Sequence, residues 1–205
     1  MTASNPHPTT DAEIIRRVRD GDARAYALLI DRHKERGMAL AFRMLRNREE
    51  AEEALQDAFV RAFKALPNFE EKSTFSTWLY RIVFNVCSTK LSRKRDIHDR
   101  GSDSDEEIII AREDPDPLPD AVLESSQSDA IIREEIEKLP EAYGTTFTLF
   151  AVHEKSYDEI VEITGVALGT VKARLFRARA LLRDAVAHRL GVSVEEDRKR
   201  KEQAA

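Results

Sequence analysis

Between Lys172 and Arg183 the chain carries five basic residues and no acidic one. On a helix with ~100° per residue, Phe176 and Arg177 fall on the side opposite the apolar residues of this stretch. An exposed Phe among cations is unfavourable unless a partner covers it, and the base edges and thymine methyl groups of a DNA major groove could do so. An amphipathic helix with a solvated basic face is the alternative. We predict DNA contacts from Thr170, Lys172, Ala173, Arg174, Phe176 and Arg177.

Two short helices are predicted to position these residues. Ser156 is followed three residues later by Glu159, which is the spacing of a capping box that opens a helix. Thr164-Gly165 should end this helix, and a second helix should begin near Gly169. Two helices joined by a turn that contains Gly form a helix-turn-helix. The face expected to pack on the first helix carries Val171, Leu175, Ala178 and Leu182.

This region resembles a known family. The segments Ser-Tyr-Asp-Glu-Ile, Gly-Thr-Val-Lys-Ala-Arg-Leu and Arg-Ala-Arg are similar to the fourth conserved region of bacterial sigma factors. The short format with two regions resembles the extracytoplasmic-function (ECF) group of that family. The resemblance implies a promoter-recognition subunit of RNA polymerase whose second helix reads the upstream (minus-thirty-five) promoter element.

A second candidate region runs from Asn68 to Arg95, where a polar loop leads into a helix with aromatic, amide and guanidinium groups. Exposed rings can stack on a single-stranded base and an amide can bond its edge, whereas buried core aromatics are the alternative. Trp78 is expected in the core, with Tyr80 on another side of the helix. The pattern Phe-(x)5-Phe-x-x-Trp-Leu-Tyr-Arg-Ile-(x)2-Asn resembles the sigma region that captures a flipped base of the downstream (minus-ten) element. The resemblance implies contacts by Phe69, Ser73, Arg81 and Asn85, although the family often has a Gly where Glu71-Lys72 stands.

An amphipathic helix is predicted from Glu49 to Leu66, ended by Pro67. Its apolar face is expected to include Phe59 and Phe63. An ordinary solvated surface would explain its polar face equally well. By resemblance to the sigma segment that docks on the polymerase clamp helices, the polar face should bind core polymerase through Glu53, Gln56, Asp57 and Arg61.

The net charge of −5 is unevenly distributed along the chain. Residues 96–129 hold twelve acidic residues and two Arg, so the remainder of the chain is basic. High charge with few Gly and Pro favours helices, and the acidic, Pro-containing stretch is typical of a flexible connector. We predict an all-α fold of two small helical domains, 10–95 and 130–190, joined by an acidic linker at 96–129. A disordered start at 1–9 and a charged tail at 191–205 would flank them.

The sequence offers little support for chemistry or membrane insertion. No nucleophile–base set, metal cluster or phosphate loop is evident, so we expect no enzyme activity and no cofactor or metal. His33 is predicted to be a surface or boundary residue. Cys87, the only cysteine, fits a role as apolar filler and a reducing cytoplasm. We expect neither a signal peptide nor a membrane span.

These expectations favour a sigma factor that binds core RNA polymerase and promoter DNA, as duplex upstream and as single strand downstream. Members of the ECF group are commonly held by an anti-sigma partner, so the resemblance implies one here. The alternative is a two-domain helix-turn-helix regulator whose N-terminal half senses a ligand or dimerises. Such a regulator should bind duplex DNA tightly without polymerase, often at a palindrome.

Overall fold

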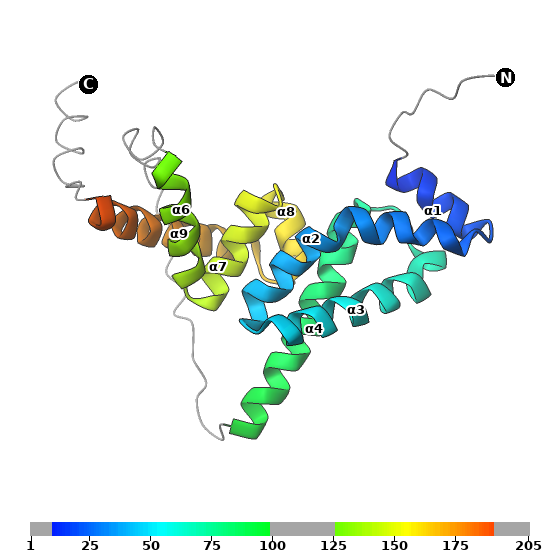
Figure 1. The fold of residues 1–205 in the computed structure, drawn as a ribbon, viewed down its shortest axis with the longest axis horizontal. Coiled ribbons are helices and arrows are strands. Elements are labelled where there is room, and N and C mark those ends of the chain that lie inside the picture. Colours follow the sequence, from blue (N-terminus) through cyan, green and yellow to red (C-terminus); the bar gives the residue numbers. More distant parts are fainter. Residues whose placement is uncertain (1–9, 99–125, 191–205) are drawn as a thin grey trace. The chain divides into compact units, whose positions relative to one another are not determined.

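The computed structural model describes residues 10–98 and 126–190, and within these ranges every regular element is helical (Figure 1). The chain separates into two compact units. The first contains the elements α1 (Asp11–Arg19), η1 (Ala23–Ala25), α2 (Tyr26–Leu45), α3 (Arg48–Ala65), η2 (Leu66–Asn68) and α4 (Phe75–His98). Most of the second is formed by α6 (Ser126–Lys138), α7 (Glu141–Phe147), the π-helical turn η3 (Thr148–Val152), α8 (Tyr157–Thr164) and α9 (Leu168–Leu190).

Side-chain caps fix where the helices of the first unit begin. A capping box opens α1, because Thr10 and Glu13 each accept a hydrogen bond from the other's backbone N–H. The Asn47 side chain accepts from the backbone N–H of Glu50 and caps α3. Thr74 does the same for Thr77 at the start of α4. Each cap satisfies an N–H group that the helix itself leaves without a partner.

Helices α2, α3 and α4 pack against one another and form the core of the first unit. The α3 surface that faces this core is lined by small buried residues at helical spacing, Ala51, Ala54, Ala58 and Ala62. Gly37 of α2 shows how close the approach is, since a Cβ atom there would lie 2.7 Å from Leu55 Cδ1. Small residues on facing helices thus bring the helix axes together and exclude water from the core.

Two predictions about individual side chains of this unit are wrong. His33 is buried rather than at the surface, because it lies between the Asp11 carboxylate, 2.9 Å away, and the Phe75 ring. Tyr80 is only 1% exposed, and its burial raises the pKa of the phenol to about 12. Cys87 is buried as expected, and its thiol pKa is raised to about 12 by the same cause.

The second unit has a core built from α6, α7 and α9. Leu139, Ala178 and Leu182 form its buried centre, with Tyr143 and Phe147 packed against them. After Pro140 the chain forms two consecutive elements, α7 and the π-helical turn η3. Helix α4 continues to His98 and α6 begins at Ser126, so both helices extend into the segment 96–129 that was predicted as a linker.

Several expectations fall outside the described residues. The disordered start at 1–9, most of the acidic linker and the charged tail at 191–205 belong to this group. Among the helices that the structure describes, none is long and apolar enough to cross a membrane.

Candidate nucleic-acid interfaces

The helix-turn-helix is present in the second unit as predicted. The Glu159 backbone N–H donates to Ser156 Oγ at 3.2 Å, and the Ser156 N–H donates to the Glu159 carboxylate at 3.0 Å, which completes the capping box of α8. Gly165 has a φ of +74°, a left-handed conformation that Gly adopts without strain. This conformation ends α8 and lets α9 begin at Leu168. The local sequence therefore sets the position of α9.

Helix α9 divides into the two predicted faces. The four apolar residues expected to pack inward are buried: Val171, Leu175, Ala178 and Leu182. Of the residues expected to contact DNA, Lys172 is exposed and the others are partly buried: Thr170, Ala173, Arg174, Phe176 and Arg177. All six lie in the N-terminal half of one continuous helix, so a single element positions them.

Further along α9, Arg179 lies over the ring of Phe150 of η3, with its guanidinium carbon 5.2 Å from the ring centroid. Such a cation–π contact stabilises both the basic side chain and the π-helical turn beneath it. The ring of Phe150 also packs on Tyr157 of α8 at 5.5 Å. These contacts tie η3 to both helices of the helix-turn-helix.

In the first unit, Arg81 and Asn85 are both exposed on α4. Their spacing of four residues places them on the same face of the helix. Residues at this spacing can contact one strand of nucleic acid that runs along the helix. The guanidinium group suits a phosphate and the amide suits a base edge.

The loop before α4 differs from the expected arrangement. Phe69 is 7% exposed, and its ring lies 4.7 Å from the ring of Trp78 and 6.2 Å from that of Phe75. The ring therefore belongs to the aromatic core at the start of α4 and is not available at the surface for stacking. Ser73 is partly buried.

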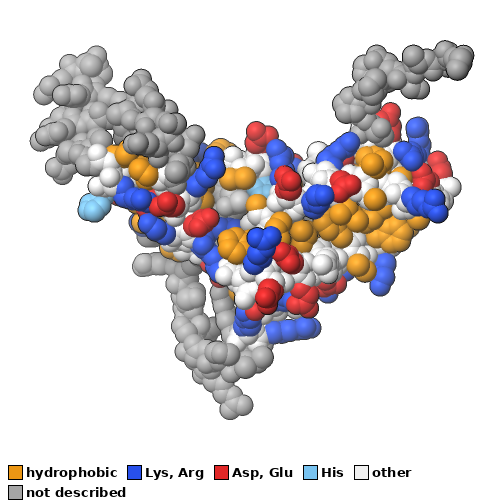
Figure 2. All heavy atoms as spheres, viewed as in Figure 1, with side chains coloured by type: hydrophobic (Ala, Val, Ile, Leu, Met, Phe, Trp, Pro, Cys, Tyr) orange, Lys and Arg blue, Asp and Glu red, His pale blue; other side chains and the backbone are white. Residues whose placement is uncertain are grey.

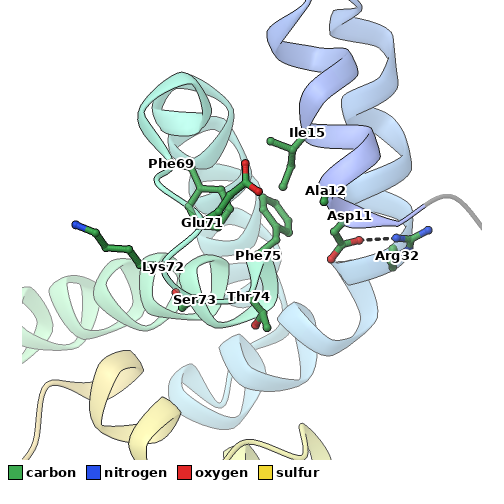
Figure 3. A pocket seen from close by; sticks show the side chains of 10 residues that line it. All are labelled: Asp11, Ala12, Ile15, Arg32, Phe69, Glu71, Lys72, Ser73, Thr74 and Phe75. Carbon is green, nitrogen blue, oxygen red and sulfur yellow. Dashed lines mark hydrogen bonds and ion pairs between the residues drawn. The ribbon is translucent and has the colours of Figure 1, made fainter.

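A pocket of about 660 Å³ opens beside this loop (Figure 3). Three elements surround it: the start of α1, the middle of α2, and the segment that leads into α4. It is lined by Asp11, Ala12, Ile15, Arg32, Phe69, Glu71, Lys72, Ser73, Thr74 and Phe75. In the close view the Lys72 side chain points away from the other lining groups, while Phe69, Phe75 and Ile15 form an apolar wall. Its volume lies within the range of small-molecule binding pockets.

Sequence reasoning missed the α1 and α2 residues of this pocket. Asp11 accepts a hydrogen bond from Arg32 (Figure 3) and is also hydrogen-bonded to His33. Burial acts to raise the pKa of the Asp11 carboxyl, but the bonds with His33 and Arg32 outweigh it and hold this pKa below its usual value. No motif in the sequence links these residues to the loop, because they lie far from it along the chain.

The polar face of α3 is held by ion pairs. Glu53 pairs with Lys90 of α4 at 2.7 Å, and Asp57 pairs with Arg61 one turn away at 2.8 Å. Gln56 is exposed between them. Exposed pairs of this kind contribute little to stability, so these side chains are free to exchange partners with a docking protein.

An apolar groove adjoins this polar face. Phe63, which was predicted to face inward, is 40% exposed because it lies at the end of α3 with its ring against Tyr26, 4.9 Å away. Val60 is 51% exposed beside it. The groove has a volume of about 400 Å³ and is lined by Ala23, Arg24, Tyr26, Ala27, Ile30, Phe59, Val60 and Phe63. Figure 2 shows a band of hydrophobic side chains over the α2 and α3 part of this unit.

Across residues 10–98 and 126–190, no group of three or more His, Cys, Asp or Glu side chains is arranged to hold a metal ion. The two candidate nucleic-acid surfaces are thus made of hydrogen-bonding, cationic and aromatic groups.

Two conserved regions of one family match the chain. Sigma-70 region 2 matches residues 29–97, and sigma-70 region 4 matches residues 129–182. The ECF RNA polymerase sigma factor SigW of Bacillus subtilis (strain 168) is 35% identical over 176 residues, which cover 82% of this chain and 92% of SigW. The RNA polymerase sigma-H factor of Pseudomonas aeruginosa is 33% identical over 181 residues, which cover 82% of this chain and 90% of that factor.

Solved structures agree in fold. One, described as CnrH in complex with the cytosolic domain of CnrY, has a TM-score of 0.57 at 23% identity and covers 87% of this chain and 97% of its own. Another, the sigma factor RpoE of Bartonella quintana in complex with the anti-sigma factor NepR, has a TM-score of 0.58 at 22% identity and covers 78% and 96%. Taken with the sequence relatives, these findings place the chain in the ECF family of RNA polymerase sigma factors, the subunits that confer promoter specificity.

Proposed function

We propose that this sigma factor recognises its promoters through two separate contacts. Helix α9 would read the upstream element as duplex DNA through the exposed Lys172 and the neighbouring Phe176 and Arg177. The pocket before α4 would hold a base of the melted downstream element, with Arg81 and Asn85 binding the same strand further along the helix. Phe75 and Asn85 are ten positions apart, which is ~15 Å along the helix, so one short single strand can reach both.

The observation that carries this proposal is the pocket itself (Figure 3). Its apolar wall of Phe69 and Phe75 suits the face of a base, and Ser73 and Thr74 add polar groups to the lining. Phe69 would act from within the wall rather than as an exposed stacking ring. A base captured here is removed from the duplex, which favours the open state of the promoter.

Core polymerase would dock on α3. We assign the interface to Glu53, Gln56, Asp57 and Arg61, as the family resemblance implies, and we add the apolar groove at Val60 and Phe63. Polar groups around an exposed apolar centre are the usual composition of a protein interface. Polymerase binding would bury Val60 and Phe63, the large hydrophobic side chains that are exposed on this helix.

We also propose that the chain has no catalytic activity of its own and acts in the cytoplasm. Strand opening would draw on base capture and polymerase contacts. The two similar solved structures are complexes with CnrY and with the anti-sigma factor NepR, which supports a comparable protein partner for this chain. Such a partner should lower the affinity of the chain for core polymerase when it is added to purified protein.

A gel-shift experiment with and without core RNA polymerase tests the proposal. Duplex fragments would first be selected from a random DNA library by the complex of this chain with core polymerase. We expect the chain alone to bind the selected fragments weakly and the complex to bind them tightly. Tight binding by the chain alone, especially at a palindrome, would instead identify a self-sufficient helix-turn-helix regulator.

A further inference from the structure

Arg19, the last residue of α1, joins this helix to the loop that forms the pocket. Its Nε donates a hydrogen bond to the Leu66 carbonyl at 3.3 Å, and its Nη2 donates to the Phe69 carbonyl. Its Nη1 forms an ion pair with the Glu71 carboxylate at 2.7 Å. One guanidinium group thus binds three points of the segment 66–71. The match to sigma-70 region 2 begins at residue 29, so Arg19 lies outside it.

Glu71 needs such a partner. Its φ of +56° is in the left-handed region, where Gly is favoured and a residue with a side chain is strained. Glu71 adopts this conformation in contact with the Arg19 guanidinium group, which also donates hydrogen bonds to the carbonyl groups of Leu66 and Phe69. The ion pair therefore fixes both the side chain of Glu71 and the backbone conformation that shapes the loop.

Arg19 holds two residues of the pocket wall in place although it does not line the pocket itself. Phe69 and Glu71 line the pocket, whereas Arg19 does not. The planar guanidinium group presents its donors in a fixed geometry, which a Lys ammonium group cannot reproduce. Without Arg19 the loop would have to be ordered when a base binds, and that ordering would weaken binding.

We propose that Arg19 is a positioning residue that holds the 66–71 loop in the shape required for base capture. This proposal rests on the proposed function of the pocket. Arg19 contacts no DNA and acts through Phe69 and Glu71. The pair Arg19 and Glu71 here takes over the conformational role that a Gly in the loop would otherwise have.

The test compares the promoters that variant holoenzymes select from a random duplex DNA library. Each sequenced pool reports the upstream and the downstream element at the same time, so one element serves as the control for the other. We expect Arg19→Ala to lower the enrichment of the preferred downstream base about tenfold, as for the loss of a charged hydrogen-bond group, and to leave the upstream element unchanged. Arg19→Lys should restore little of this enrichment.

Arg17→Ala is the matched control. It removes the same charge from the same helix, but Arg17 pairs with Asp22 at 2.7 Å and does not contact the loop. We expect wild-type enrichment at both elements for this variant. The melting temperature of each free variant and its affinity for core polymerase would be measured alongside, and Arg19→Ala should match Arg17→Ala in both.

Glu71→Gly in the Arg19→Ala background adds a second readout. Gly adopts the left-handed conformation without a partner, so the double variant should recover part of the downstream enrichment that Arg19→Ala loses. A purely structural role for Arg19 would not give this recovery. Equal loss at both elements, or no loss at either, would overturn the proposal.

Asn85→Ala separates this proposal from the one on which it rests. Loss of downstream enrichment in Asn85→Ala but not in Arg19→Ala would reject the positioning role and keep the downstream reading by α4. If neither variant changes the downstream element, the proposed function of this surface fails as well.

Discussion

The two surfaces assigned to DNA are built in different ways. The six candidate contacts of the second unit lie on one helix, and α9 presents them together through its own geometry. The pocket of the first unit is made from α1, α2 and the loop before α4, and several of its walls are held by bonds between distant residues. A substitution on α9 should therefore remove one contact, whereas a substitution near the pocket can change the shape of the whole site.

The two sites also differ in how much ordering they need when DNA binds. A helix whose inner face is fully packed needs no further ordering when it enters a DNA groove. A pocket whose walls meet through a few hydrogen bonds and partly exposed ion pairs depends on each of these contacts more than a packed helix face does. The downstream site should thus be the more sensitive of the two to temperature, salt and distant mutations.

The largest expected effect comes from a variant that weakens polymerase docking and, through it, promoter binding at both elements. Val60→Asp places a charge in the apolar groove of α3 and should weaken core polymerase binding by about 2–4 kcal/mol, since it disrupts the centre of the proposed interface. Promoter binding at both elements should fall in parallel. Affinity for core polymerase, measured by fluorescence anisotropy, checks this expectation.

Leu28→Asp is the control for that variant. Leu28 is 44% exposed on α2 but does not line the groove. It should leave polymerase affinity within about 0.5 kcal/mol of wild type, as expected of a surface substitution. Equal losses in the two variants would mean that general surface charge, rather than the groove, determines docking.

Next in size is the loss of a single upstream contact. Arg177→Ala should weaken recognition of the upstream element by ~1–3 kcal/mol if the guanidinium group makes a bidentate base contact. The downstream element and polymerase affinity should be unaffected, because α9 presents each residue independently. Competition between selected promoter fragments and their upstream variants measures the effect. Unchanged selectivity would assign Arg177 to the phosphate backbone or to no contact.

A smaller effect is expected for the downstream amide. Asn85→Ala removes one hydrogen-bonding group and should reduce open-complex formation by ~0.5–1.5 kcal/mol. Permanganate reactivity of unpaired thymines reports the open complex, and a filter-binding assay reports polymerase affinity. Simultaneous loss of both signals would show that Asn85 supports the fold and does not read DNA.

The smallest effect concerns Asp11, the partly buried carboxylate of the pocket. Because the folded-state pKa of Asp11 lies below its unfolded value, its contribution to stability is fully present above pH ~4 and is lost as the pH falls through the folded pKa. Asp11→Asn should therefore be less stable than wild type at pH 7, and the gap should narrow toward pH 3. Urea unfolding at several pH values measures the difference. A gap that is independent of pH would assign the effect to packing.

The sequence by itself determined the helix-turn-helix. The capping box at Ser156, the turn at Gly165 and the alternation of faces along α9 all depend on residues within one or two helical turns of each other. Arg81 and Asn85 were named through the family resemblance, and their spacing of four residues is enough to place them on one face of α4. These features are local, so local chemistry is enough to fix them.

Tertiary structure decided the rest. No local pattern shows that Phe69 packs against Trp78, that His33 bonds Asp11, or that Phe63 is exposed. Nor does any such pattern show that Arg19 reaches across about fifty positions to the loop at Glu71, a separation that no helical period spans. Which residues meet at such distances depends on how α1, α2, α3 and α4 pack, and that packing is settled by the whole core at once.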